Sequence, residues 1–187
     1  MNRLLILLSL LLFTKTGFAQ KPRDTVVTNV PTVHDRILYT DSLTVNGRSK
    51  HELDSIARNW CTGYFYDRLF EKDTLNSVYC RGVIAYKVKP GMINIDYVAW
   101  ITVLITCTDN KYKYQVYNIS FRPKSDALNN IGYQKDPEFL IKAYKQKHLS
   151  FGTYWNVTRG QIRDYISKMD ISVKQCIASL NKAMANQ

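Results

Sequence analysis

The chain has 187 residues, 45% of them hydrophobic, and a formal net charge of +11 at pH 7. A chain of this length buries enough apolar surface to form a core, so its fold requires neither a disulfide framework nor a structural metal. The basic balance favours anionic partners such as lipid headgroups or acidic polysaccharide, and ordinary solubility charge explains it equally well.

The N-terminal segment predicts export. Arg3 gives a positive start, residues 4–13 form an apolar run, and small residues at Gly17 and Ala19 precede a cleavage point. This pattern is typical of a secretory signal peptide, here residues 1–19. The apolar run is about half of the roughly 20 residues that a membrane-spanning helix needs. We therefore expect a soluble product in the periplasm or outside the cell, without a transmembrane segment.

The next segment predicts an arm followed by a strand. Residues 20–36 are polar, contain two prolines and have no sustained period, so we interpret them as an N-terminal arm or linker. Residues 36–45, RILYTDSLTV, indicate a strand that ends at the turn Asn46-Gly47. We expect residues 37–187 to form a single domain.

A helix is predicted to begin at Ser49. The Ser49 side chain is a good cap, Glu52 completes a capping box, and Asp54 adds negative charge at the positive end of the helix dipole. Apolar residues then recur at helical spacing: Leu53, Ile56, Ala57, Trp60, Cys61 and Tyr64. His51 lies next to Glu52 in sequence but does not face it on a helix. We therefore interpret this polar cluster as a helix start rather than as a catalytic site.

Three strands follow the helix. Residues 78–88 alternate between apolar and polar side chains, and residues 97–107 are apolar nearly throughout, which indicates a central strand. Asp109-Asn110 makes a turn, after which residues 111–121 run back as a hairpin partner. An antiparallel meander is the simplest arrangement.

Two helices are predicted in the C-terminal part. Residues 124–153 are long for a loop, and DPEFLIKAYKQK within them predicts a short surface helix capped by Asp136, with Pro137 at its first position. Thr158 and Gln161 form a second capping box. The helix after it, of more than 20 residues or broken near Asp170, has a sustained apolar stripe: Ile162, Ile166, Met169, Val173, Cys176, Ile177, Leu180 and Met184. Such a stripe suggests a coiled coil, but a helix of this kind more often lies across the sheet of its own chain.

These elements predict an α+β fold in the order β-α-β-β-β-(α)-α, with a curved antiparallel sheet of about four strands and helices packed on one face. The helix entry NGRSKHELDSIARNW, the hairpin ITVLITCTDNKYKYQVYNISF and the closing helix together resemble an exported bacterial domain-of-unknown-function family with a TBP-like (TATA-binding-protein-like) fold. The resemblance covers about residues 37–185. It implies the same curved sheet and supplies no catalytic residues. The fold name does not imply nucleic-acid binding, because an exported chain does not meet promoters.

The sequence contains no recognisable catalytic motif. Nucleophile-elbow, zinc-protease, phosphate-loop and calcium-loop patterns are all absent, and the three histidines His34, His51 and His148 lie far apart in the chain. We therefore predict no catalytic residues, no metal and no cofactor.

Two regions are candidate binding sites. In residues 111–116, Lys111 and Lys113 alternate with Tyr112 and Tyr114, which offers rings for stacking and ammonium groups for anions if the tyrosine face is accessible. A strand with one buried face has the same pattern, and we favour that interpretation. A cleft between the sheet and the last helix is the second candidate, lined by Tyr86, Trp100, Tyr114 and Met169. Large side chains more often fill such a space.

Four cysteines, Cys61, Cys80, Cys107 and Cys176, occur without a CxxC motif or a cysteine–histidine cluster. Export permits disulfides, but Cys in strongly patterned segments is often a small buried hydrophobe, and we favour buried thiols. Their pairing stays open at this point.

We carry three hypotheses of function. The first is an exported non-catalytic envelope protein that binds a protein or an anionic glycan. The second is a carrier or sensor of a small apolar ligand held between the sheet and the C-terminal helix. The third is a hydrolase whose site the sequence does not reveal.

Overall fold

The structure is a computed structural model that describes residues 29–65, 68–74, 77–88, 95–124, 136–145 and 159–185. The predicted signal peptide, the Thr158 cap and His148 lie outside these residues.

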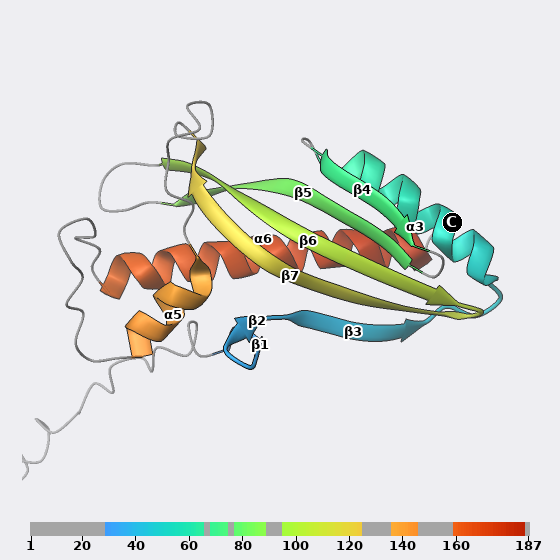
Figure 1. The fold of residues 1–187 in the computed structure, drawn as a ribbon, viewed down its shortest axis with the longest axis horizontal. Helices are drawn as coiled ribbons and strands as arrows, with labels where there is room; N and C mark the ends of the chain where they lie inside the picture. Colours follow the sequence, from blue (N-terminus) through green and yellow to red (C-terminus); the bar gives the residue numbers. More distant parts are fainter. Residues whose placement is uncertain are drawn as a thin grey trace, which may run out of the picture.

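The architecture is one antiparallel sheet with helices on one face (Figure 1). Five strands lie in the order β3-β7-β6-β5-β4. Their bounds are Tyr39–Thr44 for β3, Arg68–Thr74 for β4, Ser77–Val88 for β5, Ile95–Thr108 for β6 and Lys111–Pro123 for β7. The long apolar strand β6 lies at the centre, as its composition predicts. The α+β fold class is therefore confirmed.

Strand β4 is the element that the sequence analysis missed. Its residues, RLFEKDT, alternate poorly between apolar and polar side chains. It pairs with β5 at the edge of the sheet, with a register shift between Arg68 and Phe70. An edge strand has one neighbour, so its pattern is a weak signal.

The expected arm differs from the structure over its last residues. Residues Thr32–Val33 form β1 and Arg36–Ile37 form β2, joined by His34 and Asp35, both of which have positive φ values (49° and 62°). Two central residues with positive φ are the signature of a type I′ hairpin turn. The strand expected over residues 36–45 is interrupted at Leu38, whose N–H donates to the Pro31 carbonyl (3.1 Å). The chain before the main sheet is thus folded into a small hairpin.

Three described helices complete the fold: α3 (Lys50–Tyr64), α5 (Pro137–Lys145) and α6 (Arg159–Ala185). Helices α3 and α6 pack against the same face of the sheet, and α6 runs behind its full length (Figure 1). Helix α5 packs against α6 and also contacts β2 and β7. It lies towards the end of the molecule that is remote from the β6–β7 turn (Figure 1).

Helix α6 is continuous through Asp170, and its predicted stripe forms the centre of the core. Seven of the eight predicted stripe residues are buried, Ile177 being half-buried. Each fully buried aliphatic side chain contributes about 1.5–3 kcal/mol. Asp170 itself is buried, but its carboxylate accepts from the Tyr39 hydroxyl (2.8 Å) and the Lys174 ammonium (2.7 Å). These two donors satisfy the charge and tie β3 to α6.

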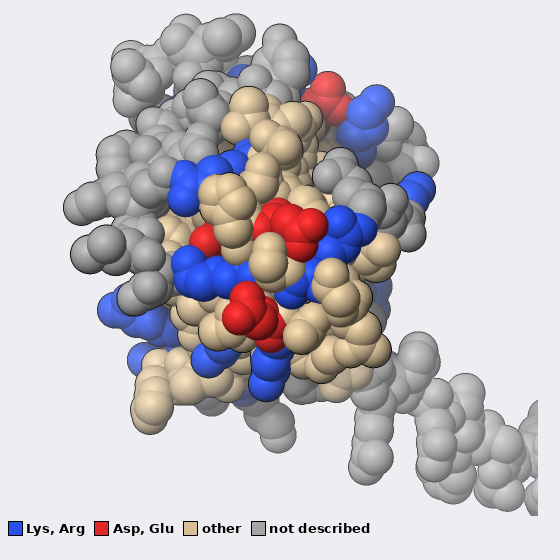
Figure 2. All heavy atoms as spheres, turned by 90° about the vertical axis from the view of Figure 1, so that its right-hand side faces the viewer, with Lys and Arg blue, Asp and Glu red and all other residues tan. Residues whose placement is uncertain are grey.

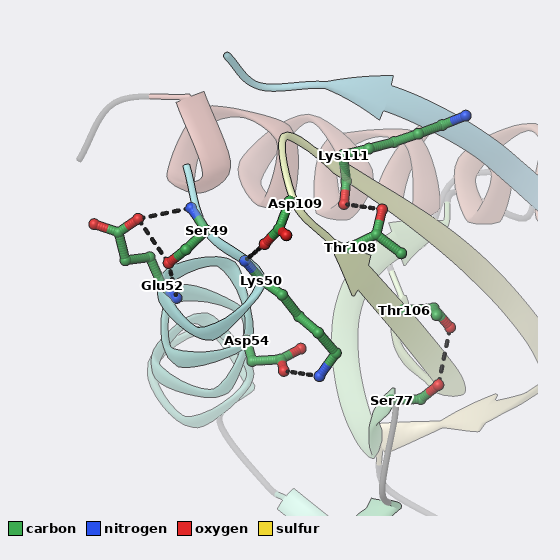
Figure 3. Close-up of polar contacts among 9 residues, drawn as sticks. All are labelled: Ser49, Lys50, Glu52, Asp54, Ser77, Thr106, Thr108, Asp109 and Lys111. Atoms are coloured by element: carbon green, nitrogen blue, oxygen red, sulfur yellow. Dashed lines mark hydrogen bonds and ion pairs between the residues drawn. The ribbon is translucent and has the colours of Figure 1, made fainter. Parts of the chain in front are cut away.

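The start of α3 is held by the capping box that the sequence predicts (Figure 3). The Glu52 carboxylate accepts from the Ser49 N–H (2.8 Å), and the Ser49 hydroxyl accepts from the Glu52 N–H (3.3 Å). The Lys50 N–H donates to Asp109 in the β6–β7 turn (2.7 Å), and the Lys50 ammonium pairs with Asp54 (2.7 Å). The polar cluster therefore begins the helix, as interpreted from the sequence, and the structure adds that it fixes the helix start to the sheet through Asp109.

None of the described helices is long and apolar enough to cross a membrane.

Gly82 in β5 is required by the close approach of Phe65, which follows α3. A Cβ at this position would collide with the Phe65 ring and lie 2.7 Å from the Phe65 Cβ. We predict that Gly82→Ala lowers the free energy of unfolding by about 1–3 kcal/mol, because the buried ring has to move. Urea unfolding measures the change.

Gly63 is the matched control, because a Cβ there meets nothing within 4 Å and the residue lies in helix α3. Gly63→Ala should raise the free energy of unfolding by about 0.5–1 kcal/mol. Equal effects of the two substitutions would contradict the role given to Phe65.

Candidate functional site

The Lys-Tyr strand does not expose its rings. Tyr112 and Tyr114 lie on the helix-facing side of β7 with 1% and 7% of their surface exposed, whereas Lys111 and Lys113 are exposed. The Tyr112 hydroxyl donates to the Asn181 side chain on α6 (2.8 Å). The condition for stacking is therefore not met, and the favoured interpretation, a strand with one buried face, is confirmed.

Of the four predicted cleft residues, three are buried in the hydrophobic core and the fourth, Trp100, lies on the other face of the sheet. Tyr86 is buried in an aromatic cluster, with ring centroids 5.9 Å from Tyr97 and 6.4 Å from Phe121. Trp100 pairs with Val83 across β5 and β6 and lies on the opposite face of the sheet, under the Arg122 guanidinium (4.5 Å). Met169 and Tyr114 are buried. Close-packed side chains occupy the space between these described elements, and one wall of the proposed cleft belongs to the other face.

The structure instead places a hollow beside the β1–β2 hairpin, which we call the hairpin cleft. Its volume is about 490 Å³. It forms where the hairpin leads into the start of β3, between β7 and the start of α5. The lining residues are Val33, Arg36, Ile37, Leu38, Gln115, Tyr117, Asn118, Ile119 and Glu138.

A second hollow, the α5 hollow, adjoins the first. Its volume is about 290 Å³, and it is lined by Thr32, Asp35, Glu138, Phe139, Ile141, Lys142 and Lys145. Glu138 lines both hollows. Of the three large hydrophobic side chains that are exposed in the described part of the chain, Val33 (47%) lines the hairpin cleft and Phe139 (51%) lines the α5 hollow. Exposed apolar surface is thus concentrated at these hollows.

Glu138 connects the two elements that form the site. Its carboxylate accepts a hydrogen bond from the Ile37 N–H of β2 (2.9 Å), so it joins α5 to the hairpin. Asp136 caps the helix by accepting from the Glu138 N–H (3.0 Å), as the DPEF sequence predicts. Partial burial, followed by a side-chain hydrogen bond with Asp136, raises the pKa of Glu138 to about 7. The carboxyl group therefore changes its charge near neutral pH.

The β7 wall of the cleft is irregular, and strand β3 does not extend along it. Asn118 has a φ of 50°, at the position where the register between β6 and β7 shifts. Such bulges are common at sheet edges and beside binding sites. Pairing with β3 ends at Val116, and among the described residues no strand pairs with β7 on that side from Tyr117 to Pro123. The cleft lies along this part of the edge.

The sequence carried only indirect signals of this site. The two positive-φ residues at His34-Asp35 do not form an Asn-Gly or Asp-Gly pair, so the hairpin turn was not recognised. Asp136-Pro137 marked the start of α5 correctly. Nothing in either segment indicated that they meet, because they are about a hundred residues apart.

Within the described ranges, no group of three His, Cys, Asp or Glu side chains is arranged to hold a metal ion. His34 lies in the turn of the β1–β2 hairpin and His51 in the first turn of α3, and the length of β3 separates these two elements (Figure 1).

The end of the molecule opposite the hollows carries charges of both signs. Figure 2 views the end that contains the β6–β7 turn, and basic and acidic side chains are interspersed over it. The Lys50–Asp54 ion pair belongs to this region. Mixed charge of this kind is typical of a solvated surface and does not form a single-sign patch for a large anion.

Comparison with known proteins shows the fold. No protein-family model and no curated protein matches the sequence. Two solved structures are similar: a TBP-like protein from Parabacteroides distasonis ATCC 8503, with 13% identity and a TM-score of 0.62, and a DUF4468 family protein from Bacteroides ovatus ATCC 8483, with 12% identity and a TM-score of 0.60. Each alignment covers 84% of this chain, and 97% and 91% of the respective structures. The TBP-like fold implied by the sequence resemblance is confirmed.

The raised pKa of Glu138 predicts a pH-dependent stability. Between about pH 4.5 and 7 the Glu138 carboxyl keeps its proton in the folded chain but has lost it in the unfolded chain. Stability contributed by this group should therefore fall as the pH rises through that window, and level off above it. Glu138→Gln cannot titrate and keeps an oxygen that accepts from Ile37.

The measurement is the midpoint of thermal unfolding of both proteins from pH 4 to 8. The midpoint of the wild type minus that of Glu138→Gln should decrease as the pH rises from about 4.5 to 7. Taking this difference separates the effect of Glu138 from that of Asp35, Asp136 and the other acids. Parallel curves would show that Glu138 titrates as an ordinary exposed acid.

Proposed function

We propose that the chain is an exported, non-catalytic envelope protein that binds an extended segment of a partner protein in the hairpin cleft. One observation carries the proposal: the cleft lies along the edge of β7 beyond Val116, where no described strand pairs with it. The signal-peptide pattern of residues 1–19 supports the exported part of the proposal.

An extended peptide suits a sheet edge because its main chain adds as a further strand, and pockets for alternate side chains provide specificity. Tyr117, Asn118 and Ile119 form the edge that lines the cleft. The bulge at Asn118 limits how far a continuous ladder can extend, so we expect a short segment.

The side chains around this edge favour a peptide with apolar anchors. Val33 presents exposed apolar surface in the hairpin cleft and Phe139 in the adjoining α5 hollow. Arg36 and Glu138 in the cleft, and Lys142 in the hollow, supply hydrogen-bonding groups of both signs. An apolar centre with a mixed polar rim is the usual composition of a protein interface.

The other two hypotheses have less support. An anionic glycan would favour a surface of one sign, whereas the two hollows mix Asp35 and Glu138 with the basic side chains Arg36, Lys142 and Lys145. A small apolar ligand between the sheet and α6 would compete with side chains such as Ile166, Met169 and Phe121, which are fully buried there. Glu138 has a pKa suited to proton transfer, but its carboxylate is engaged by the Ile37 N–H, and we assign it a structural role.

The test is a selection of random displayed peptides against the full chain. We predict that the enriched peptides alternate apolar and polar residues and bind Val33→Asp about tenfold or more weakly, because a carboxylate would be buried against their apolar anchors. Fluorescence anisotropy of a labelled peptide measures the affinity. Amide shifts of Tyr117, Asn118 and Ile119 in NMR spectra identify the edge.

Ile171→Asp is the matched control, since Ile171 on α6 is 45% exposed but lines neither hollow. It should bind the peptides as the wild type does. Peptides that bind Val33→Asp normally but lose affinity for Lys111→Glu/Lys113→Glu would place the site at the start of strand β7 and overturn the proposal. A copurified small molecule in native mass spectra would favour the carrier hypothesis instead.

A further inference from the structure

Two cysteines from different elements meet in the core. Cys61 lies on the buried face of α3 and Cys80 on the helix-facing side of β5, and neither has any exposed surface. Their Sγ atoms are 2.7 Å apart. The two residues are 19 positions apart in the chain, so this contact is produced by the docking of the helix on the sheet.

The other two cysteines have different surroundings. Cys107 lies beside the Asp54 carboxyl. Asp54 precedes Cys61 along α3 by about two helical turns, or roughly 10 Å. Cys176 on α6 is closer to the pair, since the Tyr64 side chain hydrogen-bonds to it and Cys61 affects its titration. Burial is the main cause that raises the pKa of Cys107 and of Cys176 to about 12.

We propose that Cys61 and Cys80 form a structural disulfide that fastens α3 to β5. The sulfur atoms have to approach from 2.7 Å to about 2.05 Å, a shift that side-chain rotation supplies without moving the backbone far. The bond clamps the connection between α3 and β5, which contains the edge strand β4. It thereby protects the most weakly patterned part of the sheet.

The oxidant is a small-molecule disulfide such as oxidised glutathione. The thiolate of one cysteine attacks this disulfide, forms a mixed disulfide and releases one small thiol. The thiolate of the second cysteine then attacks the protein sulfur and releases the other small thiol. Two cysteine thiols are oxidised and one small-molecule disulfide is reduced to two thiols, and the two protons that the cysteines lose are taken up by the two released small thiolates. Because both sulfurs are buried in the folded chain, the exchange takes place before α3 docks.

The experiment refolds the full chain in a mixture of reduced and oxidised glutathione, quenches it with an alkylating agent under denaturing conditions, and maps its peptides without reduction. We expect one linked peptide pair that contains Cys61 and Cys80, with Cys107 and Cys176 alkylated. A sample of the intact chain that is not alkylated should weigh about 2 Da less than the chain with four thiols. The wild-type map needs no variant that has to fold.

Variants then test the assignment. Cys107→Ser and Cys176→Ser should keep the linked pair, and Cys61→Ala/Cys80→Ala should lose it. The oxidised wild type should unfold about 5–15 °C above the reduced protein, and this difference should vanish in the double variant. Four alkylated cysteines after oxidative refolding, or a link that includes Cys107 or Cys176, would overturn the proposal.

Discussion

The burial of one face of the sheet beneath helix α6 is the constraint on which the rest of the structure depends. Alternate residues of β5, β6 and β7 point to the same side, and they require an apolar cover along the whole length of these strands. Helix α6 provides it with a stripe that is buried from Ile162 to Met184. The polar contact of Asp170 with Tyr39 lies within this interface and fixes the position of the edge strand β3 relative to the helix.

The length of α6 also determines where the candidate site forms. Its C-terminal part packs with α3, and the Ser179 hydroxyl accepts from the Trp60 indole N–H (3.2 Å). Its other contacts include α5, which brings Glu138 to the β1–β2 hairpin. The two ends of the molecule therefore differ. One end carries the start of α3 and the β6–β7 turn (Figure 1). Towards the other end, hollows lie between the hairpin, β7 and α5.

The sequence predicted the buried faces better than it predicted the site. Tyr112 and Tyr114 illustrate why: alternation with lysine shows that the tyrosines share a face, and a helix placed on that face removes them from solvent. The sequence placed Trp100 on the wrong face of the sheet because β6 is apolar on both faces. Alternation therefore does not tell which of the β6 side chains face the helices. Val33, Asn118 and Glu138 were not predicted as site residues, since each has an unremarkable local pattern.

The sequence by itself determined the helices, the three long strands and the cap of α3, because these depend on spacing and capping within a few residues. Only the tertiary structure decided that β1–β2 meets α5, that β7 keeps an edge beside them, and that Cys61 lies against Cys80. Such contacts join segments that are far apart in the chain. They depend on the strand register and on the way the helices dock, which no local pattern contains.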